Sequence, residues 1–161
     1  MQFAKICLPL LLIFSFSGCG QPRFQSEESA YIIWKTPLFR YADQGFIYSS
    51  PKQVRVEIYG SGQPLMRLEI KKNEVCSSFL RCSSKKKFNE MMLSRWYPAS
   101  FLEDLFRGKP LFGGEGMVKK RNGFTQTISN GTKYQIHYSV LNNTVIFRDT
   151  INKIQLKVIK Q

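Results

Sequence analysis

The residues that could perform catalysis are few in this sequence, and they do not combine into a catalytic set. His137 is the only histidine, and it lies between two large apolar side chains in a segment whose alternation predicts a strand. Glu103 and Asp104 are adjacent on a predicted helix, so their carboxylates point in different directions and make a poor acid–base pair. The glycine-rich stretch 113–116 lacks the Lys and Ser or Thr that follow in a phosphate-binding loop. We therefore expect no enzyme and no cofactor.

Cysteine chemistry is the next candidate, because the chain contains four cysteines. Cys76 and Cys82 have five residues between them, a spacing that matches neither a zinc knuckle nor a redox pair of the Cys-x-x-Cys type. In an oxidising compartment the two could form a small-loop disulfide, and two free thiols are an equal alternative. Because the chain has a single histidine, we expect no metal site.

Cys19 follows a segment that is typical of an export signal. Lys5 provides a positive charge, and residues 6–16 form an apolar run that is shorter than the ~20 residues a membrane-spanning helix needs. The segment Phe16-Ser17-Gly18-Cys19 resembles the bacterial lipobox. This resemblance implies that residues 1–18 are a lipoprotein signal peptide, that the mature chain begins at Cys19, and that its thiol carries the lipid. An ordinary secretory signal with an incidental cysteine is the alternative.

The charge of the chain limits the partners that it can bind. Lys and Arg outnumber Asp and Glu by 24 to 11, which gives a formal net charge of +13 at pH 7. Such an excess favours nucleic acid, an acidic protein or the headgroups of an anionic membrane. The export signal argues against nucleic acid. Lys85, Lys86 and Lys87 form a dense basic run that we interpret as a solvated turn or edge, with a functional basic patch as the alternative.

Alternating apolar and polar residues predict a mainly β protein, with a single domain over residues 34–161. Two runs with a period of two, separated by a glycine-rich turn, predict a hairpin whose apolar face carries Val54, Val56, Ile58, Met66, Leu68 and Ile70. Further runs between turn signals continue from 117 to 158, which gives about nine to eleven antiparallel strands. Residues 19–33 begin with Gln, Ser, Pro and Glu, and we expect a lipidated N-terminus and a tether there.

A single helix is predicted from residue 98 or 99 to residue 107. Pro98 suits a first helical turn, and Gly108 followed by Pro110 provides the end. The apolar stripe of this helix consists of Phe101, Leu102, Leu105 and Phe106. These side chains and the sheet either form a filled core or enclose a cavity for an acyl chain, whose transfer from water is worth about 0.8 kcal/mol per CH2. The pattern alone favours the filled core.

The order of these motifs resembles that of the LolB family, outer-membrane lipoproteins that receive other lipoproteins from the periplasmic carrier LolA. The resemblance extends from about Trp34 to Lys160. It rests on the hairpin 54–70, on the segment 97–110 with its terminal Gly-x-Pro, and on the strand segments 134–138, 145–149 and 153–158, together with the lipobox. The segment 76–87 has no obvious counterpart in the family.

This resemblance implies a LolA/LolB-like antiparallel half-barrel, closed by a helical lid, that binds acyl chains in a hydrophobic cavity without covalent chemistry. It implies a lipid-anchored monomer on the periplasmic face of the outer membrane, and Gly20 after the lipidated cysteine is compatible with that sorting. Its partners would be a LolA-like carrier, lipoprotein acyl chains and outer-membrane lipids. Leu65 stands where the family has a membrane-transfer loop. The residues implied to bind acyl chains are Val54, Val56, Ile58, Met66, Leu68, Ile70, Phe101, Leu102, Leu105 and Phe106.

A second class of function stays open beside the receptor. A structural or assembly lipoprotein, such as a chaperone for a membrane machine, could share this fold and have a filled core. Charged substitutions of Leu102 and Phe106 would distinguish the two, because a receptor would lose acyl-chain binding and an assembly factor would lose a protein partner.

Overall fold

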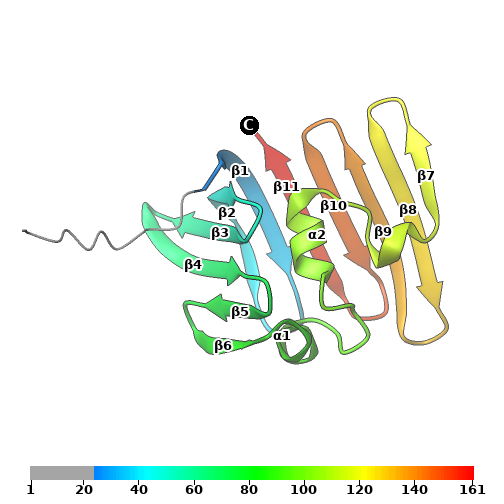
Figure 1. Cartoon of the computed structure of the whole chain (residues 1–161), viewed down its shortest axis with the longest axis horizontal. Helices are drawn as coiled ribbons and strands as arrows, with labels where there is room; N and C mark the ends of the chain where they lie inside the picture. Colours follow the sequence, from blue (N-terminus) through cyan, green and yellow to red (C-terminus); the bar gives the residue numbers. More distant parts are fainter. Residues whose placement is uncertain (1–23) are drawn as a thin grey trace, which may run out of the picture.

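The computed structural model describes residues 24–161, which form one open antiparallel sheet of eleven strands and two α-helices (Figure 1). The strand order is β6-β5-β4-β3-β2-β1-β11-β10-β9-β8-β7, so the first and last strands meet at the centre of the sheet. The mainly β class is therefore confirmed. The strands are β1 (Ser26–Lys35), β2 (Arg40–Ser49), β3 (Val54–Gly60), β4 (Gln63–Ile70), β5 (Glu74–Ser77), β6 (Leu80–Ser84), β7 (Met117–Lys120), β8 (Gly123–Asn130), β9 (Tyr134–Leu141), β10 (Thr144–Asp149) and β11 (Ile154–Lys160).

The sheet is strongly twisted. In Figure 1, strands β3 to β6 cross the direction of strands β8 to β11 at a steep angle. A right-handed twist between neighbouring strands accumulates over a sheet of this width. One face packs against the helices and is called the inner face below, and the opposite face is called the outer face.

The hairpin β3–β4 has the register that its alternation predicts. The three apolar residues of β3 pair directly with the three of β4, as Val54 with Ile70, Val56 with Leu68, and Ile58 with Met66. Side chains of directly paired residues lie on the same face of a sheet. All six therefore share the inner face, and each is at most 2% exposed.

The centre of the sheet joins the N-terminal and C-terminal halves through one row of large side chains. Trp34 in β1 pairs with Leu156 in β11, Leu156 with Phe147 in β10, and Phe147 with Tyr138 in β9. All four are buried in the same hydrophobic cluster as the β3–β4 hairpin. The two halves of the sheet therefore share one core.

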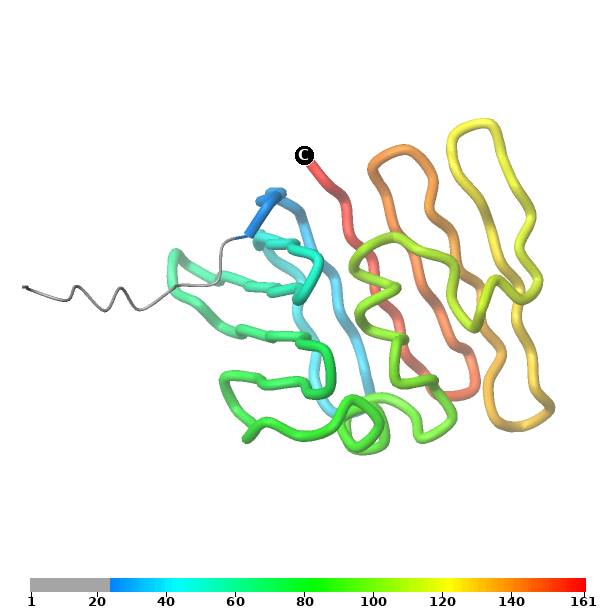
Figure 2. Tube along the Cα trace, in the orientation of Figure 1, coloured from blue at the N-terminus to red at the C-terminus, as the bar shows by residue number. Residues whose placement is uncertain are grey.

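Two short helices, α1 (Lys85–Met92) and α2 (Phe101–Arg107), lie between β6 and β7 and are followed by a 3-10 turn, η1 (Phe112–Gly114). The Ser84 side chain accepts a hydrogen bond from the Lys87 amide and begins α1. Gly108, with a φ of 66°, ends α2 in the left-handed conformation. This segment passes over the inner face of the sheet (Figure 2). No helix within residues 24–161 is long and apolar enough to cross a membrane.

Two expectations from the sequence are wrong. The predicted tether over 19–33 is wrong for residues 26–33, because β1 begins at Ser26 and its later residues Ala30 and Ile32 are buried. Lys85, Lys86 and Lys87 do not form a turn or strand edge but the first turn of α1. The predicted helix is α2, and α1 is an additional helix that the sequence did not predict.

Candidate functional site

The inner face brings together all ten side chains that were implied to bind acyl chains. Six come from the β3–β4 hairpin and four from α2, and they belong to one continuous hydrophobic cluster. None of the ten is more than 2% exposed, so water does not reach them. The residues are Val54, Val56, Ile58, Met66, Leu68, Ile70, Phe101, Leu102, Leu105 and Phe106.

Aromatic contacts hold α2 against the centre of the sheet. The ring of Phe101 lies 5.0 Å from that of Phe147, and the ring of Phe106 lies 5.6 Å from that of Trp34, both nearly edge to face. Such pairs contribute about 0.5–1.5 kcal/mol each beyond the area that they bury. Trp34 and Phe147 were not among the predicted site residues, although the alternation of Ala30, Ile32 and Trp34 could have placed Trp34 on the same face.

Trp34 also places a polar atom, the indole nitrogen Nε1, inside this apolar region. Its side chain is 1% exposed. Its Nε1 is buried and has no hydrogen-bond partner among the described residues. A buried donor without an acceptor is destabilising by about 1–3 kcal/mol. An acceptor brought in by a ligand would remove this penalty.

Charged contacts fix the outward side of α2. Glu103 accepts a hydrogen bond from Lys85 Nζ at 2.6 Å and pairs with Arg107 at 3.1 Å. Arg107 also donates to the Ser50 carbonyl at 2.7 Å. Burial alone would raise the pKa of Glu103, but the hydrogen bonds and charges of Lys85 and Arg107 outweigh it and hold that pKa below its ordinary value. Lys85 is therefore engaged in an ion pair, which argues against a free basic patch at residues 85–87.

Polar contacts also hold the segments on both sides of α2. Before the helix, the Tyr97 hydroxyl donates to Asp149 Oδ2 at 2.6 Å, and burial together with this hydrogen bond raises the pKa of Tyr97 well above its ordinary value. After the helix, the Gln126 side chain bonds both the amide and the carbonyl of Leu111. The Tyr138 hydroxyl donates to the Lys109 carbonyl at 3.1 Å. Each end of the α2 segment is thus attached to the C-terminal half of the sheet.

Three concavities on residues 24–161 lie elsewhere. They have volumes of about 370, 270 and 330 Å³, and none of them is lined by any of the ten predicted side chains. In this structure the predicted acyl-binding residues pack against one another. A hydrocarbon chain would have to displace side chains to enter between α2 and the sheet.

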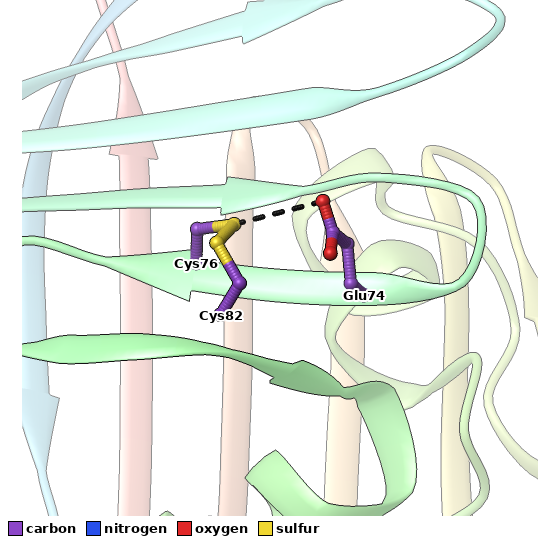
Figure 3. A group of neighbouring side chains, drawn as sticks. All are labelled: Glu74, Cys76 and Cys82. Carbon is purple, nitrogen blue, oxygen red and sulfur yellow. Dashed lines mark hydrogen bonds between the residues drawn. A yellow bond between two sulfur atoms is a disulfide. The ribbon is translucent and has the colours of Figure 1, made fainter.

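Cys76 and Cys82 form a disulfide between β5 and β6 (Figure 3). Glu74 Oε1 lies 3.8 Å from the Cys76 sulfur, and together the three residues form a cluster with metal-ligand atoms. Because each sulfur is bonded to the other, neither carries a proton or a thiolate, and the carboxylate is the only remaining ligand. The disulfide therefore serves as a covalent link between β5 and β6 at the edge of the sheet.

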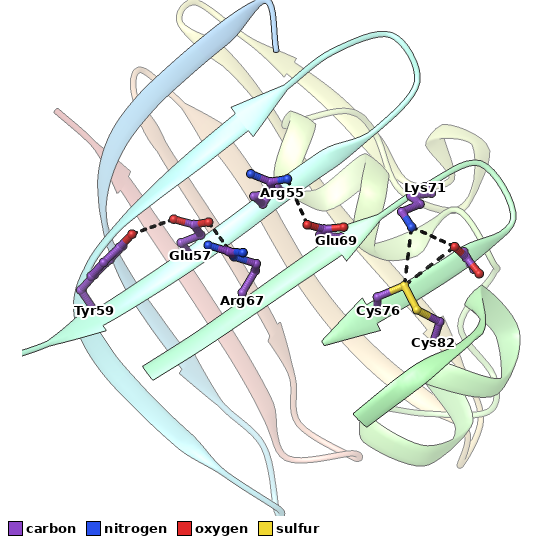
Figure 4. Close-up of polar contacts among 9 residues, drawn as sticks. Arg55, Glu57, Tyr59, Arg67, Glu69, Lys71, Cys76 and Cys82 are labelled. Carbon is purple, nitrogen blue, oxygen red and sulfur yellow. Dashed lines mark hydrogen bonds and ion pairs between the residues drawn. A yellow bond between two sulfur atoms is a disulfide. The ribbon is translucent and has the colours of Figure 1, made fainter. Parts of the chain in front are cut away.

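The outer face of the N-terminal half is a ladder of paired charges (Figure 4). Arg55 pairs with Glu69 at 3.0 Å, and Arg67 pairs with Glu57 at 2.8 Å, each across neighbouring strands. The Tyr59 hydroxyl donates to Glu57 at 2.7 Å. Arg55 and Arg67 on strands β3 and β4 are thus neutralised by carboxylates of the same sheet.

The remaining candidate residues lie apart from the inner face. Leu65 is 48% exposed near the tip of the β3–β4 hairpin. His137 is exposed on β9, and neither it nor Asp104 forms an ion pair among the described residues. Cys19, the implied lipidation site, lies outside the described residues.

No known family model matches the sequence, and no curated protein is significantly similar to it. The resemblance to the LolB family therefore rests on the order of the motifs along the chain.

Proposed function

We propose that this chain is a LolB-like lipoprotein, anchored through Cys19 to the periplasmic face of the outer membrane, that receives lipoproteins by binding their acyl chains between the inner face and α2. The observation that carries the proposal is an apolar inner face covered by a helix of only seven residues, with a buried indole donor that has no acceptor within residues 24–161. In this proposal α2 is the lid.

The energy of exchanging α2 for an acyl chain supports a reversible carrier function. Burying a palmitoyl chain is favourable by on the order of 10 kcal/mol, at about 0.8 kcal/mol per CH2. Four large side chains of α2 leave the core when the lid opens, and each contributes about 1.5–3 kcal/mol. The two quantities are similar in size, so a chain can enter and leave again. A receptor that must release its cargo requires such a balance.

Trp34 gives the proposed site a polar anchor for the ligand. The acyl groups of a lipoprotein are attached through ester and amide carbonyls, which are hydrogen-bond acceptors. The centroid of the Phe106 ring lies 5.6 Å from that of the indole, so a ligand that displaced Phe106 would lie beside Trp34. Nε1 has no acceptor within residues 24–161, and in this proposal the ligand carbonyl supplies one.

The segment after α2 has the backbone freedom that opening requires. Gly108, Gly113, Gly114 and Gly116 all have positive φ values and lie between α2 and β7. Glycine adopts this conformation without steric penalty and allows the chain to pivot. The Cys76–Cys82 disulfide also fits an exported protein, because such bonds persist in oxidising compartments. Leu65, exposed near the tip of the β3–β4 hairpin, is the residue proposed to contact the membrane during transfer.

The proposal is tested by transfer of a radiolabelled lipoprotein from its loaded periplasmic carrier to the purified chain from residue 20 onward, which contains the whole described core. The wild-type chain should take up the lipoprotein. Leu102→Glu with Phe106→Glu should abolish uptake, and the control Val118→Glu, an exposed apolar position on β7, should retain it. Mass spectrometry of the purified wild type should detect acyl ligand. Absence of both transfer and bound acyl chains would overturn the proposal.

A second candidate function is favoured by the packing of the inner face. The ten side chains belong to one continuous buried cluster, and none of them lines the three concavities described on residues 24–161, as expected for an assembly lipoprotein with a filled core. In that case the wild type would carry no acyl ligand, and the same double substitution would release a protein partner instead.

A further inference from the structure

A row of basic residues crosses the outer face at the centre of the sheet, from β2 to β10. Successive cross-strand pairs join Arg40 in β2 to Lys35 in β1, Lys35 to Gln155 in β11, and Gln155 to Arg148 in β10. Directly paired residues lie on one face. Their neighbours Trp34 and Phe147 point into the core, so the three cations of the row point outward.

These cations line a concavity rather than a flat surface. Lys35, Arg40 and Arg148, joined by Lys153 from the β10–β11 turn, line a hollow of about 370 Å³. The hollow lies between the β1–β2 turn and the β10–β11 turn, which are neighbours because β1 pairs with β11. Its volume is sufficient for a phosphate group and the polar part to which the phosphate is attached.

None of these four cations has a carboxylate partner among the ion pairs of residues 24–161. The charge ladder on β3 and β4 shows the contrast, because there Arg55 and Arg67 are each paired across the strands (Figure 4). Four positive charges around one hollow repel each other unless an anion lies between them. The concentration of unpaired charge thus indicates an anionic ligand.

Asp149 is the only carboxylate that lines the hollow, and it is already satisfied by the protein. Its Oδ2 accepts hydrogen bonds from the Tyr97 hydroxyl at 2.6 Å and from Asn152 Nδ2 at 2.7 Å. Its Oδ1 accepts from the backbone amides of Gln135, Ile151 and Asn152. Asp149 is 1% exposed, so it stiffens the β10–β11 turn from within and leaves the cations free to bind a ligand.

The β1–β2 turn, on the other side of the hollow, is also held by hydrogen bonds to a buried side chain. Thr36 is 4% exposed, and its Oγ1 accepts hydrogen bonds from the amides of Leu38 and Phe39 at 3.1 and 3.2 Å. This arrangement fixes the β1–β2 turn. Buried polar contacts therefore hold the backbone of both turns beside the hollow before any ligand arrives.

Exposed apolar side chains lie in the turns and the loop beside the hollow. Leu38 in the β1–β2 turn is 65% exposed, and Ile151 in the β10–β11 turn is 39% exposed. Trp96, 48% exposed, lies in the loop after α1 with Lys133 over its ring at 4.6 Å. The Asn152 side chain, in the β10–β11 turn, donates to the carbonyl of Lys133. Trp and aliphatic tips beside Lys and Arg are typical of surfaces that lie in a bilayer interface, where phosphates and acyl chains are adjacent.

We propose that this hollow binds the phosphate of an anionic phospholipid headgroup at a membrane surface, with Lys35, Arg40, Arg148 and Lys153 around the phosphate and with Leu38 and Ile151 inserted among the lipid chains. Arg148 and Arg40 can each offer two N–H groups to phosphate oxygens. The site is separate from the inner face, and it does not rest on the proposed acyl-chain binding.

The test is flotation of the chain from residue 20 onward with vesicles of phosphatidylcholine containing phosphatidylglycerol. Lys35→Ser with Arg148→Ser should weaken vesicle binding by about 30-fold, since each basic residue near an anionic surface contributes about fivefold. The matched control is Lys119→Ser with Arg121→Ser, which removes the same charges from exposed positions at β7 and its turn. The control should bind within about twofold of wild type. Unchanged thermal midpoints show that both variants fold.

Leu38→Ser distinguishes the lipid from a free phosphate. It should weaken vesicle binding by about tenfold or less, as expected for one inserted aliphatic side chain, and should leave any calorimetric binding of inorganic phosphate unchanged. Equal loss in the pocket and control variants would overturn the proposal, because net charge rather than the hollow would then bind the vesicle. Full vesicle binding by the pocket variant would overturn it as well. Binding of inorganic phosphate as tight as that of vesicles would assign the hollow to a soluble anion.

Discussion

At the residue scale, Trp34 combines two features that rarely occur together. It is fully buried at the centre of the sheet, where Phe39 and Phe106 pack against its ring, and its indole N–H has no acceptor in the described part of the chain. Buried polar groups in folded proteins are almost always hydrogen-bonded. We therefore expect an acceptor atom of the ligand to hydrogen-bond to this indole N–H.

Replacement of Trp34 by Phe should weaken binding of an acyl ester by about tenfold, because one net hydrogen bond contributes about 1–1.5 kcal/mol. Fluorescence displacement with a fatty acyl ester would measure this change. A hydrocarbon probe without a carbonyl should bind the variant and the wild type with similar affinity. Trp96→Phe is the control, because Trp96 is exposed and lies outside the core. If the variant lost affinity for both probes equally, the indole would contribute packing alone.

At the scale of elements, α2 owes its position to contacts between residues that are far apart in the sequence. Lys85 and Glu103 are separated by 18 positions, and Tyr97 and Asp149 by 52. A helix of seven residues is too short to be stable by itself. Its stability therefore depends on the sheet beneath it and on the charges of Lys85 and Arg107 beside it.

Acidification should loosen α2 through Glu103. Its pKa is lower in the folded protein than in the unfolded chain, so its contribution to stability is complete above the unfolded pKa of about 4.3. That contribution is lost as the pH falls through the lower folded pKa, because protonation removes the attraction of Lys85 and Arg107. Hydrogen exchange of the α2 amides should accelerate over this range in the wild type.

The Glu103→Gln variant separates this effect from general acid unfolding. Its α2 amides should exchange faster than those of the wild type at pH 7 and should lack the additional change on acidification. Glu115→Gln is the control, because Glu115 is exposed and belongs to no ion pair of the described chain. Identical pH profiles for the wild type and Glu103→Gln would show that the ion pair does not hold the helix.

The alternation of side chains was sufficient to predict the β3–β4 hairpin, the strands after residue 117 and the apolar stripe of α2. Strand β1 was missed because its first half, Ser26–Ser29, is polar and leaves only Ala30, Ile32 and Trp34 to show the period. Helix α1 was missed because lysines fill its first turn, and Lys85 is buried only through its pairing with Glu103. The basic hollow depends on the β1–β11 pairing, which no local pattern contains.

At the scale of the whole molecule, the pairing of β1 with β11 decides how the protein unfolds. This pairing makes one sheet of two halves that are otherwise built from local hairpins. The buried inner-face row from Trp34 to Tyr138 extends the core from one half of the sheet to the other, and α2 packs on the same row through Phe101 and Phe106. The two halves should therefore unfold together.

Replacement of Phe147 by Ala tests this cooperativity. Phe147 is fully buried, and its ring contacts those of Tyr97, Phe101 and Tyr138. Loss of the ring should lower the free energy of unfolding by about 3–5 kcal/mol, whereas Ile146→Ala, its partly exposed neighbour on the outer face, should lower it by less than about 1.5 kcal/mol. In a Trp96→Phe background, tryptophan fluorescence reports on Trp34 alone, and far-ultraviolet circular dichroism reports on the entire sheet. In urea, both signals should shift together to a lower midpoint, because a shared core makes the transition two-state. Two separate midpoints would mean that the halves unfold independently and that the pairing of β1 with β11 does not couple them.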